Sequence, residues 1–106
     1  MRANSRFKNI INKSNRPVIV DFYADWCQPC KEIQPVLCEL KNTFRESIRI
    51  LKVNVDYNSY IANQFKVKSI PTVMIFKSGN LEWSREGLIF LPELTDILKK
   101  YLREAR

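Results

Sequence analysis

The sequence contains no histidine and few cysteines, the side chains that most often build metal sites and disulfide frameworks. Its 106 residues include three cysteines. A closed four-ligand zinc site would therefore need carboxylates or a second chain, and we expect no metal. Three cysteines cannot all pair within one chain, and this favours thiol chemistry over a structural disulfide framework.

The sequence also lacks a long apolar run. Nothing in it approaches the roughly eighteen consecutive apolar residues that cross a bilayer. No apolar segment with a small-residue cleavage site follows Met1. We therefore expect a cytoplasmic protein with no membrane contact. Apolar residues make up 45% and charged residues 27% of the chain, which predicts an ordinary single domain over residues 1–106.

Acidic residues are scarce relative to basic ones. The formal net charge is +7, and residues 1–16 carry five of the basic residues and no acid. This segment has two interpretations: a transit peptide or nucleic-acid arm, or a solvated first helix with Phe7, Ile10 and Ile11 facing inward. The helical spacing favours the second. Because the aromatic residues are spaced for a core and not for base stacking, we expect no nucleic-acid partner.

The hydrophobic pattern alternates between strands and helices. Pro35 falls inside one predicted helix and should bend it, not end it. Helices that cross over between parallel strands, followed by a hairpin, predict a mixed sheet with helices on both faces. The predicted elements are a helix from Asn4 or Ser5 to about Lys13, strand 18–23, a helix from Pro29 to about Arg45, strand 48–55, a short helix 58–65, strands 72–76 and 81–86 around the turn 77–80, and a last helix from Pro92.

The most informative motif is the pair Cys27 and Cys30. Two intervening residues at a helix start let the sulfurs reach bonding distance in a very small ring. The helix N-terminus stabilises a thiolate at Cys27, which can attack a partner's disulfide. Cys30 would then attack Cys27 and release the reduced partner. The alternative is a pair of inert buried thiols or half a metal site, which the strand-to-helix context disfavours.

The stretch Val20–Lys31, centred on Trp26-Cys27-Gln28-Pro29-Cys30, closely resembles the active-site segment of the thioredoxin family. Ile70-Pro71-Thr72 resembles the other signature of that family, and the resemblance extends from Val18 through the last helix. It implies an α/β thioredoxin fold with a mixed sheet of four or five strands. The fifth strand is in doubt because the segment before Val18 is short.

The resemblance also implies an activity. The chain would be a protein-disulfide reductase that acts as a monomer on disulfide-containing proteins, has no bound cofactor and is recharged by a thioredoxin reductase. One alternative is a disulfide oxidant or isomerase, which fits an exported protein. The other is a binding module of the same fold that recognises a partner without turnover.

Further site residues follow from the resemblance. Pro71 would be a cis-proline beside the cysteines. Asp21 would exchange protons with Cys30, with Lys52 as its charged partner. Within an apolar strand, burial of Asp21 should raise its pKa. The alternative is an Asp21 that faces the surface and a solvated Lys52.

The resemblance assigns substrate contact to an apolar rim around the cysteines. Trp26, Ile70 and Gly87 would form this rim, with Gln28 and Pro29 between the cysteines. Gln28 stands where the family usually has glycine, which leaves the direction of redox tuning open. Glu86 and Ser69 also depart from the family pattern, so partner choice would differ.

Cys38 lies eleven residues beyond Cys27 on the predicted helix. That separation is about 16 Å along the helix axis, too far for an intramolecular disulfide. We expect a spectator thiol, with glutathionylation or dimer formation as the alternative.

Overall fold

The apolar run Val18–Tyr23 forms β1, an inner strand of a four-stranded sheet with the order β2-β1-β3-β4. The computed structural model describes residues 2–104, with side chains for residues 6–102. β1 pairs in parallel with β2 (Arg49–Asn54) and antiparallel with β3 (Thr72–Lys77), which pairs antiparallel with β4 (Asn80–Glu86). The predicted mixed sheet is confirmed, with four strands among the described residues.

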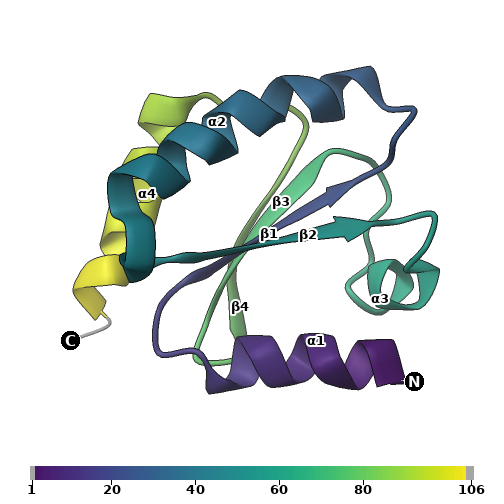
Figure 1. Ribbon diagram of the computed structural model, residues 1–106, viewed down its shortest axis with the longest axis horizontal. Helices are drawn as coiled ribbons and strands as arrows, with labels where there is room; N and C mark the ends of the chain where they lie inside the picture. The colour runs from purple at the N-terminus through teal and green to yellow at the C-terminus, as the bar shows by residue number, and fades with distance from the viewer. Residues whose placement is uncertain (1, 105–106) are drawn as a thin grey trace.

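Helices cover both faces of this sheet, as predicted (Figure 1). α1 (Arg2–Lys13) and α3 (Ser59–Gln64) lie on one face, and α2 (Gln28–Phe44) and α4 (Leu91–Glu104) lie on the other. A short 3-10 turn, η1 (Arg45–Ser47), links α2 to β2. α2 continues through Pro35, so the proline does not end it.

Several element boundaries differ from the sequence prediction, most of them by one residue, and two of the differences are instructive. α1 begins at Arg2, before the predicted caps Asn4 and Ser5, because the apolar spacing carries no signal ahead of Phe7. The hairpin turn is shorter than predicted, since β3 continues to Lys77 and β4 begins at Asn80. Ser78 and Gly79 both have positive φ, of 52° and 84°, the backbone of a tight two-residue hairpin turn.

Alternation along the strands divides the core into two clusters. On the α1/α3 face, Val18, Val20 and Phe22 pack with a trio of rings, Phe7, Phe65 and Phe76. The ring centroids in this trio lie 5.4–6.2 Å apart in edge-to-face geometry, which favours aromatic contact. The α2/α4 face holds Ile19 and the buried side chains of both helices.

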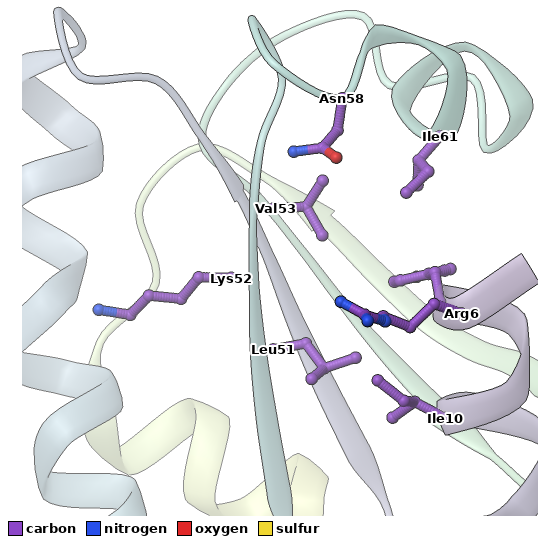
Figure 2. Close-up of a pocket in the computed structure, with 8 residues that line it drawn as sticks. Arg6, Ile10, Leu51, Lys52, Val53, Asn58 and Ile61 are labelled. Atoms are coloured by element: carbon purple, nitrogen blue, oxygen red, sulfur yellow. The ribbon is translucent and has the colours of Figure 1, made fainter. Parts of the chain in front are cut away.

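β2 is an edge strand whose outer side pairs with no other strand among residues 2–104. An open groove of about 540 Å³ lies between β2, α1 and α3 (Figure 2). Leu51 and Val53 point toward the helices across this groove, while Lys52 points to the opposite face of the sheet (Figure 2). Lys52 therefore lies on the α2 side, the face that also carries the cysteines.

Candidate active site

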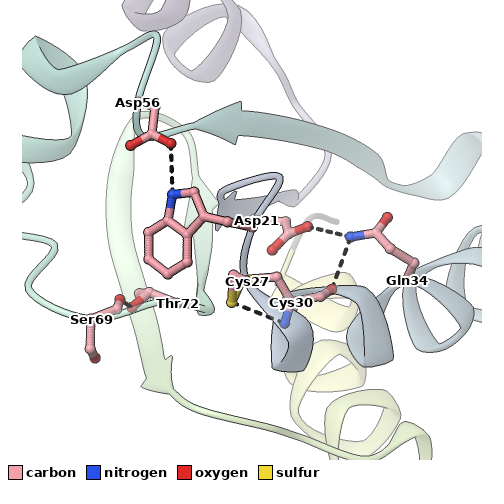
Figure 3. Close-up of a disulfide and its surroundings, with 8 residues drawn as sticks. Asp21, Cys27, Cys30, Gln34, Asp56, Ser69 and Thr72 are labelled. Carbon is pink, nitrogen blue, oxygen red and sulfur yellow. Dashed lines mark hydrogen bonds between the residues drawn. A yellow bond between two sulfur atoms is a disulfide. The ribbon is translucent and has the colours of Figure 1, made fainter.

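The cysteine pair lies where β1 gives way to α2. The chain turns after Tyr23, and Cys27 takes the N-cap position of α2, directly before Gln28. Its sulfur accepts a hydrogen bond of 3.2 Å from the backbone N–H of Cys30 (Figure 3). Pro29 occupies the first turn, where its missing N–H costs no helical hydrogen bond. The local sequence therefore starts the helix at the reactive sulfur.

Cys27 and Cys30 form a disulfide, with their Cα atoms 5.3 Å apart. Both side chains are buried, at 4% and 2% exposure, whereas Gln28 and Pro29 between them are exposed. The unpaired N–H groups at the start of α2 stabilise negative charge on a sulfur at the N-cap. This arrangement can open to a dithiol and close again with little backbone movement.

Asp21 lies on β1 below α2, with no exposed surface. Its Oδ2 accepts a hydrogen bond of 3.0 Å from Gln34 Nε2. Burial raises the pKa of the Asp21 carboxyl, while the hydrogen bond from Gln34 and the positive charge of Lys52 pull that pKa down. The structure thus rules out the alternative of a surface-facing Asp21.

Lys52 is the neighbour of Asp21 in the β1–β2 register, and its side chain is exposed. Among residues 6–102 it forms no ion pair with Asp21, so its influence is that of a nearby charge and not of a direct contact. A pocket of about 240 Å³ is lined by Lys52, Cys30 and Gln34, together with Tyr23 and other residues. This pocket therefore borders Cys30 on the side of Lys52.

The Ile70–Pro71 peptide bond is cis, as the resemblance implies, and Ile70 packs against the cysteine pair. Pro71 is buried, and its carbonyl accepts a hydrogen bond of 2.8 Å from the backbone N–H of Gly87. Gly87 has a φ of 89°, a left-handed conformation that favours glycine. A Cβ at this position would meet no atom within 4 Å, so the backbone conformation, and not crowding, calls for glycine.

Trp26 and Ile70 line one shallow groove of about 200 Å³, together with Ser69. Trp26 is 71% exposed, and its indole N–H donates a hydrogen bond of 2.9 Å to Asp56 Oδ2 (Figure 3). Ile70 is half-buried and packs against the cysteine pair. The predicted rim residues Trp26 and Ile70 therefore share one surface, while Gly87 is linked to the next residue along, Pro71, by its backbone hydrogen bond.

Sequence reasoning missed two residues of this site, Gln34 and Asp56. Gln34 lies four residues after Cys30 in α2, so both side chains fall on one helix face. A polar residue beside the buried position Ile33 was the available signal. Asp56 follows β2 in a turn, and nothing in the sequence pairs it with Trp26.

Cys38 is free and exposed, so the spectator role stays a prediction and its surface position leaves it accessible for the alternative of glutathionylation or dimer formation. In the part of the chain that the structure describes, no group of three or more histidine, cysteine or acidic side chains could hold a metal. Within residues 2–104, no helix has both the length and the apolar character to cross a membrane.

Comparison with known proteins places this geometry in context. The sequence profile described as thioredoxin matches residues 1–100. The chain is 37% identical over 100 residues to a thioredoxin of Acidithiobacillus ferridurans, covering 94% of this chain and 93% of that protein. It is 42% identical over 99 residues to the chloroplastic M-type thioredoxin of Spinacia oleracea, covering 93% of this chain and 55% of that protein. The oxidised mitochondrial thioredoxin 3 of Saccharomyces cerevisiae superposes with a TM-score of 0.83 at 32% identity, covering 92% of this chain and 89% of that one.

Proposed function

The chain belongs to the thioredoxin family, and from this premise we propose how its residues divide the work of disulfide exchange. It is a thiol:disulfide oxidoreductase that reduces protein disulfides through the reversible Cys27–Cys30 disulfide. The observation that carries this function is the disulfide at the N-terminus of α2. The proposal assigns a role to each side chain around it.

Cys27 is the attacking thiol and Cys30 the resolving one. The Cys27 thiolate attacks one sulfur of the substrate disulfide, forming a mixed disulfide and releasing the other sulfur as a thiolate. Cys30 then loses its proton and attacks Cys27, and the second substrate sulfur leaves as a thiolate. The substrate gains two electrons, and the cysteine pair becomes the oxidised form. The N-cap position of Cys27 supports its role, because charge on its sulfur is stabilised there.

Asp21 accepts the proton that Cys30 must lose, directly or through a water. Its burial beneath α2 and its raised pKa support this role, because a base works best when its pKa approaches the working pH. Lys52 keeps part of the Asp21 population ionised through its charge.

The substrate binds across the exposed surface around the cysteines. Trp26 and Ile70 supply apolar contact, Gln28 and Pro29 border the disulfide, and the Pro71 segment lies beneath the approaching chain. The exposure of Trp26, Gln28 and Pro29 supports this assignment. The open space beside Gly87 leaves room for a partner backbone to approach.

We further propose that residues 1–106 work as one domain and as a monomer. The protein would be recharged by a thioredoxin reductase and would act in the cytoplasm, the reducing compartment that suits a disulfide reductase. Its relatives come from bacteria, chloroplasts and mitochondria, so the compartment rests on this redox argument.

Serine variants test the division of labour between the cysteines. Cys27→Ser should abolish reduction of a disulfide-bonded protein such as insulin. Cys30→Ser should also lose turnover but should accumulate a mixed disulfide through Cys27, visible on a non-reducing gel. Cys38→Ser is the matched control and should keep full turnover. Turnover by Cys27→Ser would overturn the assignment of the nucleophile.

The reduction potential of the Cys27/Cys30 pair tests the direction of exchange. A value near those of reducing thioredoxins supports the reductase, and a value near those of oxidants and isomerases supports disulfide formation. Unchanged partner binding and phenotype in a Cys27→Ser/Cys30→Ser variant would indicate the binding module instead.

A further inference from the structure

Gln34 links the buried carboxylate to the turn that carries the resolving cysteine. Its side-chain Nε2 donates to Asp21 Oδ2 at 3.0 Å and to the backbone carbonyl of Cys30 at 3.4 Å (Figure 3). The two contacts come from one amide nitrogen, so a single side chain bridges β1 and the first turn of α2.

No second donor shares this task. Among the described side chains, Gln34 is the only one that donates a hydrogen bond to the Asp21 carboxylate. Asp21 Oδ1 and Gln34 Oε1 are both buried and have no hydrogen-bond partner in the described part of the structure. Loss of the Gln34 amide would therefore leave a buried carboxylate with neither oxygen bonded to a side chain, which is costly for the charged form.

We propose that Gln34 is a positioning residue for the resolution step, and that its amide holds the Asp21 carboxylate ionised and aligned with Cys30. This inference rests on the proposed role of Asp21 as the proton acceptor. It adds a residue to that mechanism without changing which groups react.

The physical basis is the difference between the two protonation states of Asp21. A hydrogen bond to a carboxylate is stronger than one to a neutral carboxyl, so Gln34 favours the ionised form. Ionised Asp21 is the form that takes the Cys30 proton. That transfer leaves Cys30 as the thiolate that attacks Cys27, and the substrate sulfur leaves with the electron pair of the mixed disulfide.

Other groups around Asp21 act in weaker ways. From β2, Lys52 faces it as an exposed charge, which solvent and salt screen. From β3, its register neighbour is the uncharged Val73. α2 contributes Cys30 as well as Gln34. The remaining ionisable residues around the adjoining pocket are Tyr23, Asp25 and Lys31. Gln34 is half-buried, and it is the one among these that makes a direct hydrogen bond to Asp21.

The test follows the two chemical steps separately in a Cys38→Ser background. The reduced protein is mixed with an aryl disulfide reagent such as 5,5′-dithiobis(2-nitrobenzoate), whose aryl thiolate absorbs visible light. The first thiolate release reports attack by Cys27, and the second reports resolution by Cys30. Rates of both releases are recorded against pH.

Gln34→Met keeps the side-chain length and removes the N–H donors. We expect the pH midpoint of the second release to move upward by about one unit, so that resolution below the midpoint slows about tenfold. The first release should keep its wild-type profile. Gln34→Lys restores an N–H donor and should return the midpoint to the wild-type value or below it. Gln64→Met is a matched control on an exposed part of α3 and should change neither release.

The outcomes separate this inference from the mechanism on which it rests. If Asp21→Asn leaves the second-release profile unchanged, the proposed role of Asp21 fails. If Asp21→Asn alters that profile and Gln34→Met does not, the positioning role of Gln34 alone is overturned. The same holds if Gln34→Lys behaves as Gln34→Met does. Combining Gln34→Met with Asp21→Asn should add nothing to Asp21→Asn, because both changes act on one group.

Discussion

The two faces of β1 carry different kinds of buried side chain, although their residues alternate along one strand. Val18, Val20 and Phe22 point to the α1/α3 side, into a cluster that is apolar throughout. Ile19 and Asp21 point to the α2/α4 side, where a carboxyl group lies among apolar side chains with no exposed surface. The first face buries no ionisable side chain of β1, whereas the second buries the carboxyl group of Asp21 close to the disulfide.

This difference shows where the molecule departs from maximal stability. A carboxyl group is tolerated on the α2/α4 side because Gln34 hydrogen-bonds it and Lys52 lies within electrostatic reach. The buried polar group on the α1/α3 side is Thr72, an uncharged hydroxyl that pairs with Phe22 in the sheet and donates a hydrogen bond to the Ser69 carbonyl. The comparison therefore predicts stability changes without functional changes on one side, and coupled changes on the other.

The largest stability effect should come from the α1/α3 side. Phe76 is buried among the rings of Phe7 and Phe65, so Phe76→Ala should lower the free energy of unfolding by about 3–5 kcal/mol. Urea unfolding measures this loss, and turnover per folded molecule should stay at the wild-type level. Phe90→Ala is the matched control, since Phe90 is 70% exposed, and should change stability by at most about 0.5 kcal/mol. A large loss of turnover in folded Phe76→Ala would break the separation between the two faces.

Asp21→Asn should change the free energy of unfolding by an intermediate amount. It should raise that free energy, whereas Phe76→Ala lowers it. Burial raises the pKa of Asp21 in the folded protein. The stability that this shift confers is fully present below the ordinary pKa of about 3.8, where the carboxyl is neutral, and it is lost as pH rises through the folded pKa and the buried group becomes charged. Removing the buried charge should therefore stabilise the protein by about 1–3 kcal/mol at pH 7. The gain should vanish as pH falls toward 3.8.

Thermal or urea unfolding over this pH range checks that prediction, together with the rate of mixed-disulfide resolution. Stabilisation accompanied by slower resolution would sharpen the contrast between the faces. A stability gain that did not depend on pH would show that the effect is not electrostatic.

The smallest effect should come from Lys52. Lys52→Gln removes a charge that lies near Asp21 but makes no ion pair with it, so the pKa of Asp21 should rise by less than it does in Gln34→Met. NMR titration of the Asp21 carboxyl measures this rise. The difference from wild type should shrink as salt is added, because Lys52 is exposed. A shift as large as that from Gln34→Met would show that the exposed charge and the half-buried hydrogen bond act equally.

The sequence predicts the secondary structure and topology of the molecule better than its individual side-chain contacts. β1 and α2 follow from local periodicity, and the family resemblance supplied the cis form of Ile70–Pro71, which base rates alone would have opposed. The contact between Gln34 and Asp21 joins residues thirteen positions apart on different elements. Its formation depends on how α2 is set over the sheet, which a one-dimensional pattern does not record.

The sequence also predicted helix boundaries and loop contacts less well. The predicted cap residues at Asn4 and Ser5 lie inside α1, because capping residues also occur within first turns. Asp56 approaches Trp26 only because the turn after β2 brings a distant acid to the indole N–H. Such pairs depend on tertiary placement and not on residue type alone.

The open edge of β2 also bears on how copies of this protein behave when crowded together. An unpaired strand edge is a template on which another chain can add a strand and begin a fibre. Arg49 and Lys52 both carry exposed charges along this short edge. If two copies paired along this edge, these positive charges would repel each other. Lys52, which lowers the pKa of the buried Asp21, therefore also opposes self-assembly. Any neutral replacement of Lys52, however mild for redox chemistry, would weaken that protection.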